Sequence, residues 1–233
     1  MSLPDQHLAE IRQLYLFAHL DDAQFKQAMD HAKLIQLTAG DMLFAEGDPC
    51  HHFYVVIRGM IKLFKSSPDG SEKILELVTA KQLFGEEAMF IGQHSVYADA
   101  LEPTRLIAFD GHYFAGLLRD NSDLCLRMMT LMSHRSKSLL DEIGNLTLQS
   151  GIQRVVQYLM EAGNYSDIAC TIHLNLPKNV IASRLGVKPE TFSRIIAKLR
   201  NEGMIDCTRD TIKLKNVDSL QQVADGMLWL KVA

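Results

Sequence analysis

The sequence predicts an α+β protein, in which an amino-terminal antiparallel β-barrel is followed by a long helix and a small carboxyl-terminal domain with a two-stranded wing. Three observations predict this order. Short apolar runs alternate with turn residues over residues 34–108, apolar side chains then recur at heptad spacing, and two short amphipathic helices near the carboxyl end meet at a glycine. The chain has 233 residues, of which 47% are hydrophobic and 22% charged, as expected for one or two globular domains.

The β-rich segment is predicted from apolar runs at residues 53–57, 61–64 and 74–78, which are separated by turn residues. The turn signals are Gly40 with Asp41, Glu46 to Asp48, Arg58 with Gly59, and Pro68 to Gly70. Their spacing of roughly 7 to 12 residues is typical of an antiparallel barrel or sandwich, and Asp-Gly between alternating strands predicts a hairpin. Before this segment, residues 8–32 predict short helices interrupted at Asp21 and Asp22.

A long helix is predicted next, because one apolar seam continues with steps of four and three residues. The seam, expected to be a dimer interface, consists of Cys125, Met129, Met132, Ser136, Leu139, Ile143 and Leu146. About 22 residues at 1.5 Å per residue give a rod of roughly 33 Å. A second stripe of Leu124, Met128 and Leu131 lies beside the seam and is expected to pack on the barrel, leaving the seam for a second copy of the chain. A buried helix in a monomer is the alternative.

The expected domain organisation follows from these elements, with the main boundary near Gln149. The segments are a sensory barrel over 1–110, a dimerisation helix over 111–148, a winged domain over 149–215 and a tail over 216–233. The tail, with its apolar residues 227–230, receives no function from the sequence.

Residues 178–200 predict a helix-turn-helix. The first helix runs through Ile181, Ala182 and Leu185 and ends at Gly186, where a turn accepts a positive φ, and Pro189 suits the first position of the second helix. The inward stripe of that second helix is expected to be Phe192, Ile195, Ile196 and Leu199. Glu190, Ser193 and Arg194 then share the opposite face.

These outward residues suit the chemistry of the DNA major groove. Arg194 can donate two hydrogen bonds to guanine, Glu190 can accept from cytosine, and Ser193 can contact a base or a phosphate. The remaining expected DNA contacts are Lys188, Thr191, Lys198 and Arg200. Residues 177–215 contain nine Lys or Arg and four Asp or Glu, a net +5 in a chain of net −4, so the remainder carries −9. A solvated charged face or a helical hairpin in an enzyme are the alternatives, but the predicted wing over 204–214, turning at Arg209 and Asp210, favours DNA.

The order of barrel, long helix and winged helix-turn-helix resembles the Crp/Fnr superfamily over residues 14–214. Glu190-Thr191-Phe192-Ser193-Arg194 is similar to the Glu-x-x-Ser-Arg pattern of the Fnr branch, whereas Pro189 and Ser193 depart from the Arg-Glu-Thr-x-Gly-Arg pattern of the Crp branch. Residues 86–90 and 189–195 further resemble the Dnr subgroup of nitric-oxide-responsive regulators. The resemblance implies a jelly roll like that of cyclic-nucleotide-binding domains, a homodimer on a palindrome of TTGAT-type half-sites in double-stranded DNA, and recruitment of RNA polymerase.

The resemblance also identifies candidate ligand-binding residues, which are Phe84, Gly85, Glu86, Glu87, His94 and Ser95. Phe84 to Glu86 occupy the place of the family's phosphate-binding cassette, where cyclic-nucleotide members carry a later Arg-Ser pair. This chain instead reads His94-Ser95-Val96-Tyr97. A buried phosphodiester needs a permanent cation, which a histidine is not near neutral pH, and this argues against cyclic AMP.

The sensed ligand stays open among haem, another small molecule and no ligand. An Fnr-type iron-sulfur cluster is not expected, because no cysteine precedes Cys50. The Dnr resemblance implies haem and nitric oxide, and haem needs an apolar slot and an axial ligand. The nine histidines offer candidates of equal rank: His7, His19, His31, His51, His52, His94, His112, His134 and His173.

Other function classes receive little support from the sequence. The cysteines Cys50, Cys125, Cys170 and Cys207 form no Cys-x-x-Cys pair, so neither a zinc site nor a disulfide framework is predicted. A metal oxygenase built on the barrel would need a cluster of histidines and carboxylates, which the sequence lacks, so no enzyme is expected. A cyclic-nucleotide-binding module that controls an activity other than transcription is the other alternative, and the predicted reading helix argues against it. Residues 1–10 contain no signal sequence and no apolar run spans a membrane, so a cytoplasmic protein without membrane contact is expected.

Overall fold

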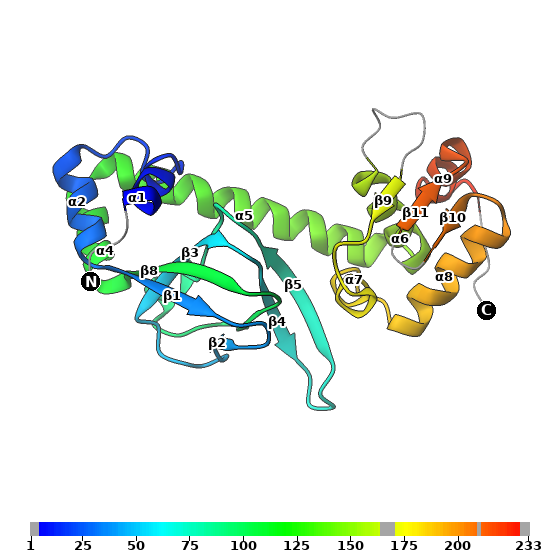
Figure 1. The fold of residues 1–233 in the computed structure, drawn as a ribbon, viewed down its shortest axis with the longest axis horizontal. Coiled ribbons are helices and arrows are strands. Elements are labelled where there is room, and N and C mark those ends of the chain that lie inside the picture. The colour runs from blue at the N-terminus through cyan, green and yellow to red at the C-terminus, as the bar shows by residue number, and fades with distance from the viewer. Residues whose placement is uncertain (1–4, 164–170, 209–210, 229–233) are drawn as a thin grey trace. The chain divides into compact units, whose positions relative to one another are not determined.

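The computed structural model describes residues 5–163, 171–208 and 211–228 and divides into two compact units, Met1–Lys137 and Ser138–Ala233. The division falls inside the longest helix, α5 (Ser122–Leu148), which is drawn in green in Figure 1. The boundary expected near Gln149 lies beyond the end of that helix. The last turns of α5 therefore belong with the carboxyl-terminal unit.

The first unit begins with two short helices, α1 (Asp5–Arg12) and α2 (Asp22–Asp30). Asp21 is the N-cap of α2, where its carboxylate accepts a hydrogen bond from the backbone N–H of Gln24 at 2.8 Å. The Gln24 side chain accepts in turn from the N–H of Asp21 at 3.2 Å, which completes a capping box. The predicted interruption at Asp21 and Asp22 is thus the start of a helix.

Two four-stranded antiparallel sheets follow, with the orders β1-β8-β3-β6 and β2-β7-β4-β5. Their strands are β1 (Ala32–Leu37), β2 (Met42–Phe44), β3 (His52–Arg58), β4 (Ile61–Ser66), β5 (Glu72–Val78), β6 (Leu83–Phe84), β7 (Tyr97–Ala100) and β8 (Thr104–Asp110). Among the described residues the sheets form a jelly-roll-like sandwich, which confirms the predicted jelly roll, although the sheets do not close into a barrel. β6 has two residues and β2 has three, too short to continue the pairing from one sheet into the other.

Successive residues of β3 enter two different cores, because side chains alternate between the faces of a strand. Phe53 and Val55 pack with the helices on the outer face of their sheet, where the Phe53 and Phe109 rings stack at 4.9 Å. Tyr54 and Val56 lie in the core between the two sheets. The apolar run predicted at residues 53–57 is therefore a strand buried on both faces.

The first unit also contains the helices α3 (Glu86–Ile91) and α4 (Gly111–Asp120) and the first part of α5. The segment 111–148 contains α4 and α5 rather than one helix, and the break lies at Asn121, whose side chain accepts from the N–H of Leu124 at 2.9 Å. Leu124 and Met128 of α5 are buried in the helix-covered core. The prediction that this stripe packs on the chain's own β-rich domain is confirmed.

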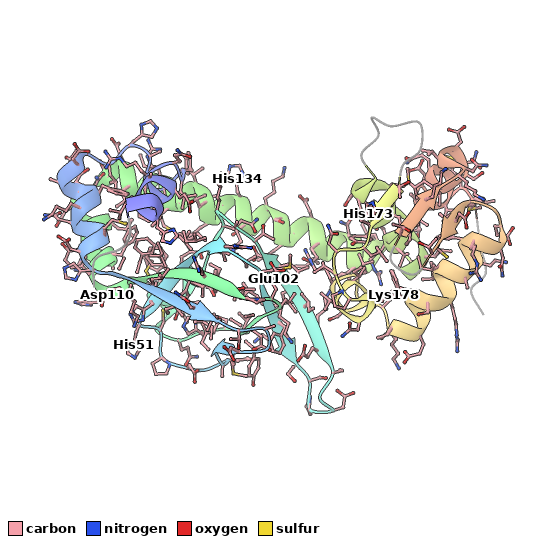
Figure 2. All side chains as sticks on the ribbon, viewed as in Figure 1. His51, Glu102, Asp110, His134, His173 and Lys178 are labelled. Atoms are coloured by element: carbon pink, nitrogen blue, oxygen red, sulfur yellow. The ribbon has the colours of Figure 1, made fainter. Side chains whose placement is uncertain are left out.

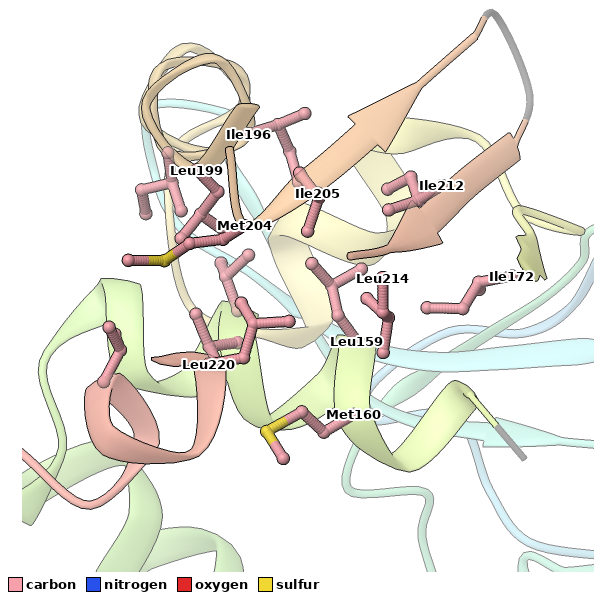
Figure 3. Close-up of a cluster of buried hydrophobic side chains, with 14 of the residues drawn as sticks. Leu159, Met160, Ile172, Ile196, Leu199, Met204, Ile205, Ile212, Leu214 and Leu220 are labelled. Atoms are coloured by element: carbon pink, nitrogen blue, oxygen red, sulfur yellow. The ribbon is translucent and has the colours of Figure 1, made fainter. Parts of the chain in front are cut away.

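The second unit packs helices on a small sheet around one apolar core, part of which Figure 3 shows. Its elements are α6 (Gly151–Ala162), β9 (Thr171–His173), α7 (Lys178–Arg184), α8 (Pro189–Asn201), β10 (Ile205–Cys207), β11 (Thr211–Leu214) and α9 (Val217–Ala224). The predicted wing strands are β10 and β11, and β9 pairs with β11 to give the order β10-β11-β9. The predicted wing turn at Arg209 and Asp210 lies outside the described residues.

The segment after Asn216 contributes to this core, although the sequence indicated no role for it. Asn216 caps α9 by accepting from the N–H of Ser219 at 3.0 Å. Leu220 and Val223 of α9 are buried with the α6 residues. The following Leu228 packs against the same cluster, while residues 229–233 lie outside the described part of the chain.

No helix within the described residues is both long enough and apolar enough to cross a membrane.

Candidate functional site

The turn between α7 and α8 is closed by backbone hydrogen bonds around Gly186. Its φ is +64°, the left-handed conformation that favours glycine, as the sequence predicts. The N–H of Val187 donates to the carbonyl of Ala182 at 3.0 Å, which ends α7 and directs the chain into α8. Pro189 then occupies the first turn of α8, where no N–H is required.

One face of α8 is fixed in the core and the other faces solvent. Phe192, Ile195 and Leu199 are at most 1% exposed, and Ile196 is also buried, which confirms the predicted inward stripe. Glu190, Ser193 and Arg194 are exposed on the opposite face. The structure thus presents two charged groups and a hydroxyl on a helix whose rotation about its own axis is fixed by packing.

The other predicted DNA contacts differ in their surroundings. Lys188 and Arg200 are exposed, and Lys188 is the N-cap residue of α8 without a side-chain cap. Lys198 is half-buried and pairs with Glu202 at 2.8 Å, and Thr191 is half-buried. Lys188 and Arg200 are therefore the residues of this group best placed to meet phosphates.

Two arginines that the sequence did not single out connect this helix-turn-helix to the end of α5. Arg184 of α7 forms an ion pair with Glu142 of α5. Arg154 of α6 donates to the carbonyls of Leu185, at 2.8 Å, and Gln149, at 2.6 Å. Since backbone carbonyls are present at every residue, no residue pattern marks them as partners of a particular arginine.

In the first unit, the predicted ligand residue Glu86 meets α5. Glu86 is 2% exposed as a residue, and its carboxylate pairs with the guanidinium of Arg135. Arg135 also donates to both carboxylate oxygens of Glu76 at 2.9 and 3.0 Å and to the carbonyl of Leu83 at 3.1 Å. Burial lowers the pKa of Arg135, but Glu86 and Glu76 raise it beyond its ordinary value. A permanent cation of α5 is therefore held by two carboxylates of the β-rich domain.

This ion-pair cluster lines a cavity of about 250 Å³. The cavity walls come from the segment after α1, from β5 and β6, and from α5. They comprise Leu14, Tyr15, Leu16, Phe17, Glu76, Lys81, Gln82, Leu83, Glu86, Leu131 and Arg135. The second carboxylate oxygen of Glu86, Oε2, is buried and has no hydrogen-bond partner among the described residues. A ligand in this cavity lies beside Glu86 and the guanidinium of Arg135.

The other predicted ligand residues do not line this cavity. Phe84 is buried in the core between the sheets, and Gly85 begins α3 with φ +77°. Burial and the nearby charge of Glu86 raise the pKa of Glu87. Ser95 is half-buried beside His94. Of the predicted set, therefore, only Glu86 lines this cavity, while Gly85 lies close to the ring of His94.

His94 is a buried histidine, 3% exposed, whose ring stacks on that of Phe44 at 3.6 Å between centroids. Its Nδ1 has no hydrogen-bond partner among the described residues. Burial lowers its pKa below the ordinary value. Because the neutral ring is favoured here, His94 is a poor partner for a phosphodiester.

The described residues contain no group of three or more side chains arranged to hold a metal ion. The histidines labelled in Figure 2 come from separate elements, His51 before β3, His134 on α5 and His173 on β9. Of the side-chain types that ligate haem iron, the cavity walls contain a tyrosine, Tyr15, which is 50% exposed, and no histidine, cysteine or methionine. None of the nine candidate histidines therefore lies in the walls of this cavity.

The remaining face of α5 carries exposed apolar side chains. Met129, Leu139 and Ile143 of the predicted seam are 58%, 49% and 58% exposed. Cys125 and Leu146 are half-buried, Ser136 is exposed, and Met132 packs against the helix-covered core of its own unit. Leu126 and Leu140, absent from the predicted seam, are 60% and 68% exposed and widen this face. Their separation of two heptads is the signal in the sequence that could have identified them.

Two protein families match this chain. The family described as "Cyclic nucleotide-binding domain" matches residues 34–121, and "Crp-like helix-turn-helix domain" matches residues 153–223. The second match extends into α9, in agreement with the packing of that helix.

This chain is similar over most of its length to a regulatory protein, a cyclic AMP receptor protein and DNR. "Fumarate and nitrate reduction regulatory protein" of Escherichia coli K12 is 26% identical over 205 residues, covering 86% of this chain and 81% of that protein. "Cyclic AMP receptor protein" of Thermus thermophilus is 24% identical over 213 residues, covering 91% and 97%. The crystal structure of DNR from Pseudomonas aeruginosa is 30% identical, with a TM-score of 0.53 and coverage of 95% of this chain and 99% of that one.

Proposed function

Since the chain belongs to the Crp/Fnr family and is a DNA-binding transcription regulator with a domain of the ligand-sensing type, we propose that it acts as a ligand-gated homodimer on a palindrome of TTGAT-type half-sites. Each protomer would read one half-site through α8. The dimer would form along α5 and recruit RNA polymerase when its reading helices have the required separation.

The observation that carries this proposal is the fixed outward face of α8. Arg194 can direct two N–H donors to guanine, and Glu190 can accept from the amino group of cytosine. Ser193 lies between them on the same face, and Lys188 and Arg200 supply charge for phosphates. These roles follow the Fnr-type pattern noted in the sequence, which is the basis for choosing the TTGAT half-site.

The homodimer is supported by the apolar face of α5. Met129, Leu139, Leu140 and Ile143 are each about half or more exposed in the single chain. Met129, Leu139 and Ile143 follow the spacing of a two-stranded coiled coil, in which a second α5 covers the seam, and Leu140 lies beside them. A dimer also provides the two reading helices, about 34 Å apart, that a palindrome requires.

The ligand is proposed to act at the cavity beside Glu86 and Arg135. Any occupant lies against Arg135, the side chain that joins α5 to Glu76 and Glu86. The cavity walls contain no histidine to ligate haem iron, but the Dnr resemblance makes haem with nitric oxide the first ligand to test. Cyclic AMP is the second ligand to test, because one relative is named a cyclic AMP receptor protein. The neutral ring of His94 argues against it, since a phosphodiester needs a cation.

The test is a fluorescence-anisotropy titration of purified protein against a duplex in which TTGAT and ATCAA are separated by four base pairs, with a scrambled duplex at the same salt. The series is repeated with cyclic AMP, with haem, and with haem and nitric oxide. Tight binding to the palindrome alone supports the DNA site, and dependence on one ligand identifies the signal. Equal binding to both duplexes under every condition contradicts the proposed half-site.

A further inference from the structure

Arg154 contacts four backbone carbonyls that come from two separate helix ends. Its guanidinium donates to Leu185, at 2.8 Å, and Gly186, at 3.2 Å, in the turn after α7. The same group donates to Gln149, at 2.6 Å, and Leu146, at 3.3 Å, at the end of α5. One side chain of α6 thus joins the last turn of α5 to the turn that leads into the reading helix.

Two further contacts join the same parts of the second unit. Glu142, one turn earlier on α5, pairs with Arg184 at the end of α7. Gly151 at the start of α6 lies close to Val187: a Cβ added to Gly151 would be 3.0 Å from Cγ1 of Val187. The segment between α5 and α6 is therefore packed directly on the helix-turn-helix, and it is not a free linker.

Electrostatics explains why an arginine suits this position. The carbonyl ends of α5 and α7 both carry partial negative charge, and a cation placed between them stabilises both. The planar guanidinium has five N–H donors in fixed directions, so it can bond to several carbonyls at once, whereas lysine is a compact point charge on a flexible stem.

We infer that Arg154 is a positioning residue that fixes the orientation of α8 relative to α5 and thereby sets the half-site spacing that the dimer accepts. The inference rests on the proposed homodimer on a palindrome. A change of one base pair in the spacer moves a half-site by about 3.4 Å and rotates it by about 35°. A rigid connection between α5 and α8 resists that displacement, and a loosened one tolerates it.

The experiment compares the full chain with Arg154→Gln, Arg154→Lys and Arg200→Gln on duplexes with spacers of three, four, five and six base pairs. We expect the unaltered protein to prefer one spacer over its neighbours by about tenfold or more, comparable with the cost of one wrong base pair. Both Arg154 variants should bring this ratio close to one. Arg200→Gln, which removes an exposed cation of α8, should weaken binding to every spacer equally.

The outcomes separate the two proposals. An unchanged spacer ratio in Arg154→Gln overturns the positioning role, and an unchanged ratio in Arg154→Lys shows that charge alone is sufficient and overturns the geometric argument. If the unaltered protein binds none of the duplexes, the proposed DNA site fails instead. The positioning role is then measured without DNA. Spin labels are attached to cysteines placed at the exposed Asn145 and Asn201 of an otherwise cysteine-free protein, and the distance between the two labels is measured. Labelled protein is mixed with excess unlabelled protein, so that only distances within one protomer are recorded. Both Arg154 variants, and not Arg200→Gln, should broaden that distance distribution; equal widths overturn the inference.

Discussion

The carboxylate of Glu86 and the guanidinium of Arg135 form an ion pair between the start of α3 and the middle of α5, with side chains 3% and 26% exposed. Replacing Arg135 with Met should lower the free energy of unfolding of the β-rich unit by about 3 kcal/mol, because the carboxylate of Glu86 then stays buried without its partner. Hydrogen exchange of peptides from β3 and β8 measures this, since it reports on the opening of that unit alone.

The control is the double variant Glu86→Gln with Arg135→Met, which removes both charges. It should recover a large part of the lost stability, since no unpaired charge remains buried. If the double variant loses as much stability as Glu86→Gln and Arg135→Met lose separately when added together, the pair contributes packing rather than charge.

The pH dependence of stability should carry a signature of His94. Burial keeps its pKa below the ordinary value of about 6.5, so the folded protein holds the neutral ring while the unfolded chain takes up a proton. The stability that His94 contributes is therefore complete above pH 6.5 and is lost as the pH falls from there to its folded pKa. His52, whose pKa burial also lowers, adds a loss of the same sign.

His94→Phe, which retains a ring to stack on Phe44, should reduce this fall when urea unfolding is followed at several pH values between 7 and 5. His52 contributes to the part that persists. The exposed His112→Gln is the matched loss of a histidine and should leave the fall as it is in the parent protein. An equal fall in the parent protein and His94→Phe would contradict the assignment.

The helix-turn-helix was predictable because its determinants are local. Gly186, Pro189 and the spacing of Phe192, Ile195 and Leu199 lie within one short segment, and each acts through a backbone preference or a helical period. The strands were predictable for the same reason, from apolar runs that end at turn residues.

The features that were not predictable depend on contacts between distant segments. Arg135 meets Glu86 across 49 residues, and Arg154 meets carbonyls 31 and 32 residues away, which no periodicity reports. Closure of the barrel depends on how edge strands pair, and the two-residue β6 left no clear pattern in the sequence. Likewise, β9 pairs with the wing strand β11, which lies about 40 residues further along the chain, and its own three residues do not indicate that partner.

Dimerisation should depend on the exposed apolar face of α5. Ile143→Asp places a charge in the seam, where two copies face each other, so sedimentation equilibrium should give a monomer in place of a dimer. Binding to the palindrome should weaken with it. Asn145→Asp adds the same charge at an exposed position of the same turn outside the seam and should leave the mass that of a dimer. A monomeric parent protein would contradict the proposed interface.

Arg194 and Arg200 should affect DNA binding in different ways, although both are arginines on α8. Arg194→Gln removes the two-donor contact with guanine, so it should cost about 1–3 kcal/mol per half-site on the palindrome and much less on a scrambled duplex. Arg200→Gln removes a phosphate contact, so it should weaken both duplexes by the same factor and reduce the slope of log affinity against log salt by about 0.9 per protomer. Anisotropy titrations of both variants on both duplexes over a salt series separate these effects. If Arg194→Gln kept the parent's ratio between the two duplexes, sequence reading would have to lie elsewhere on α8, with Glu190 the next residue to vary.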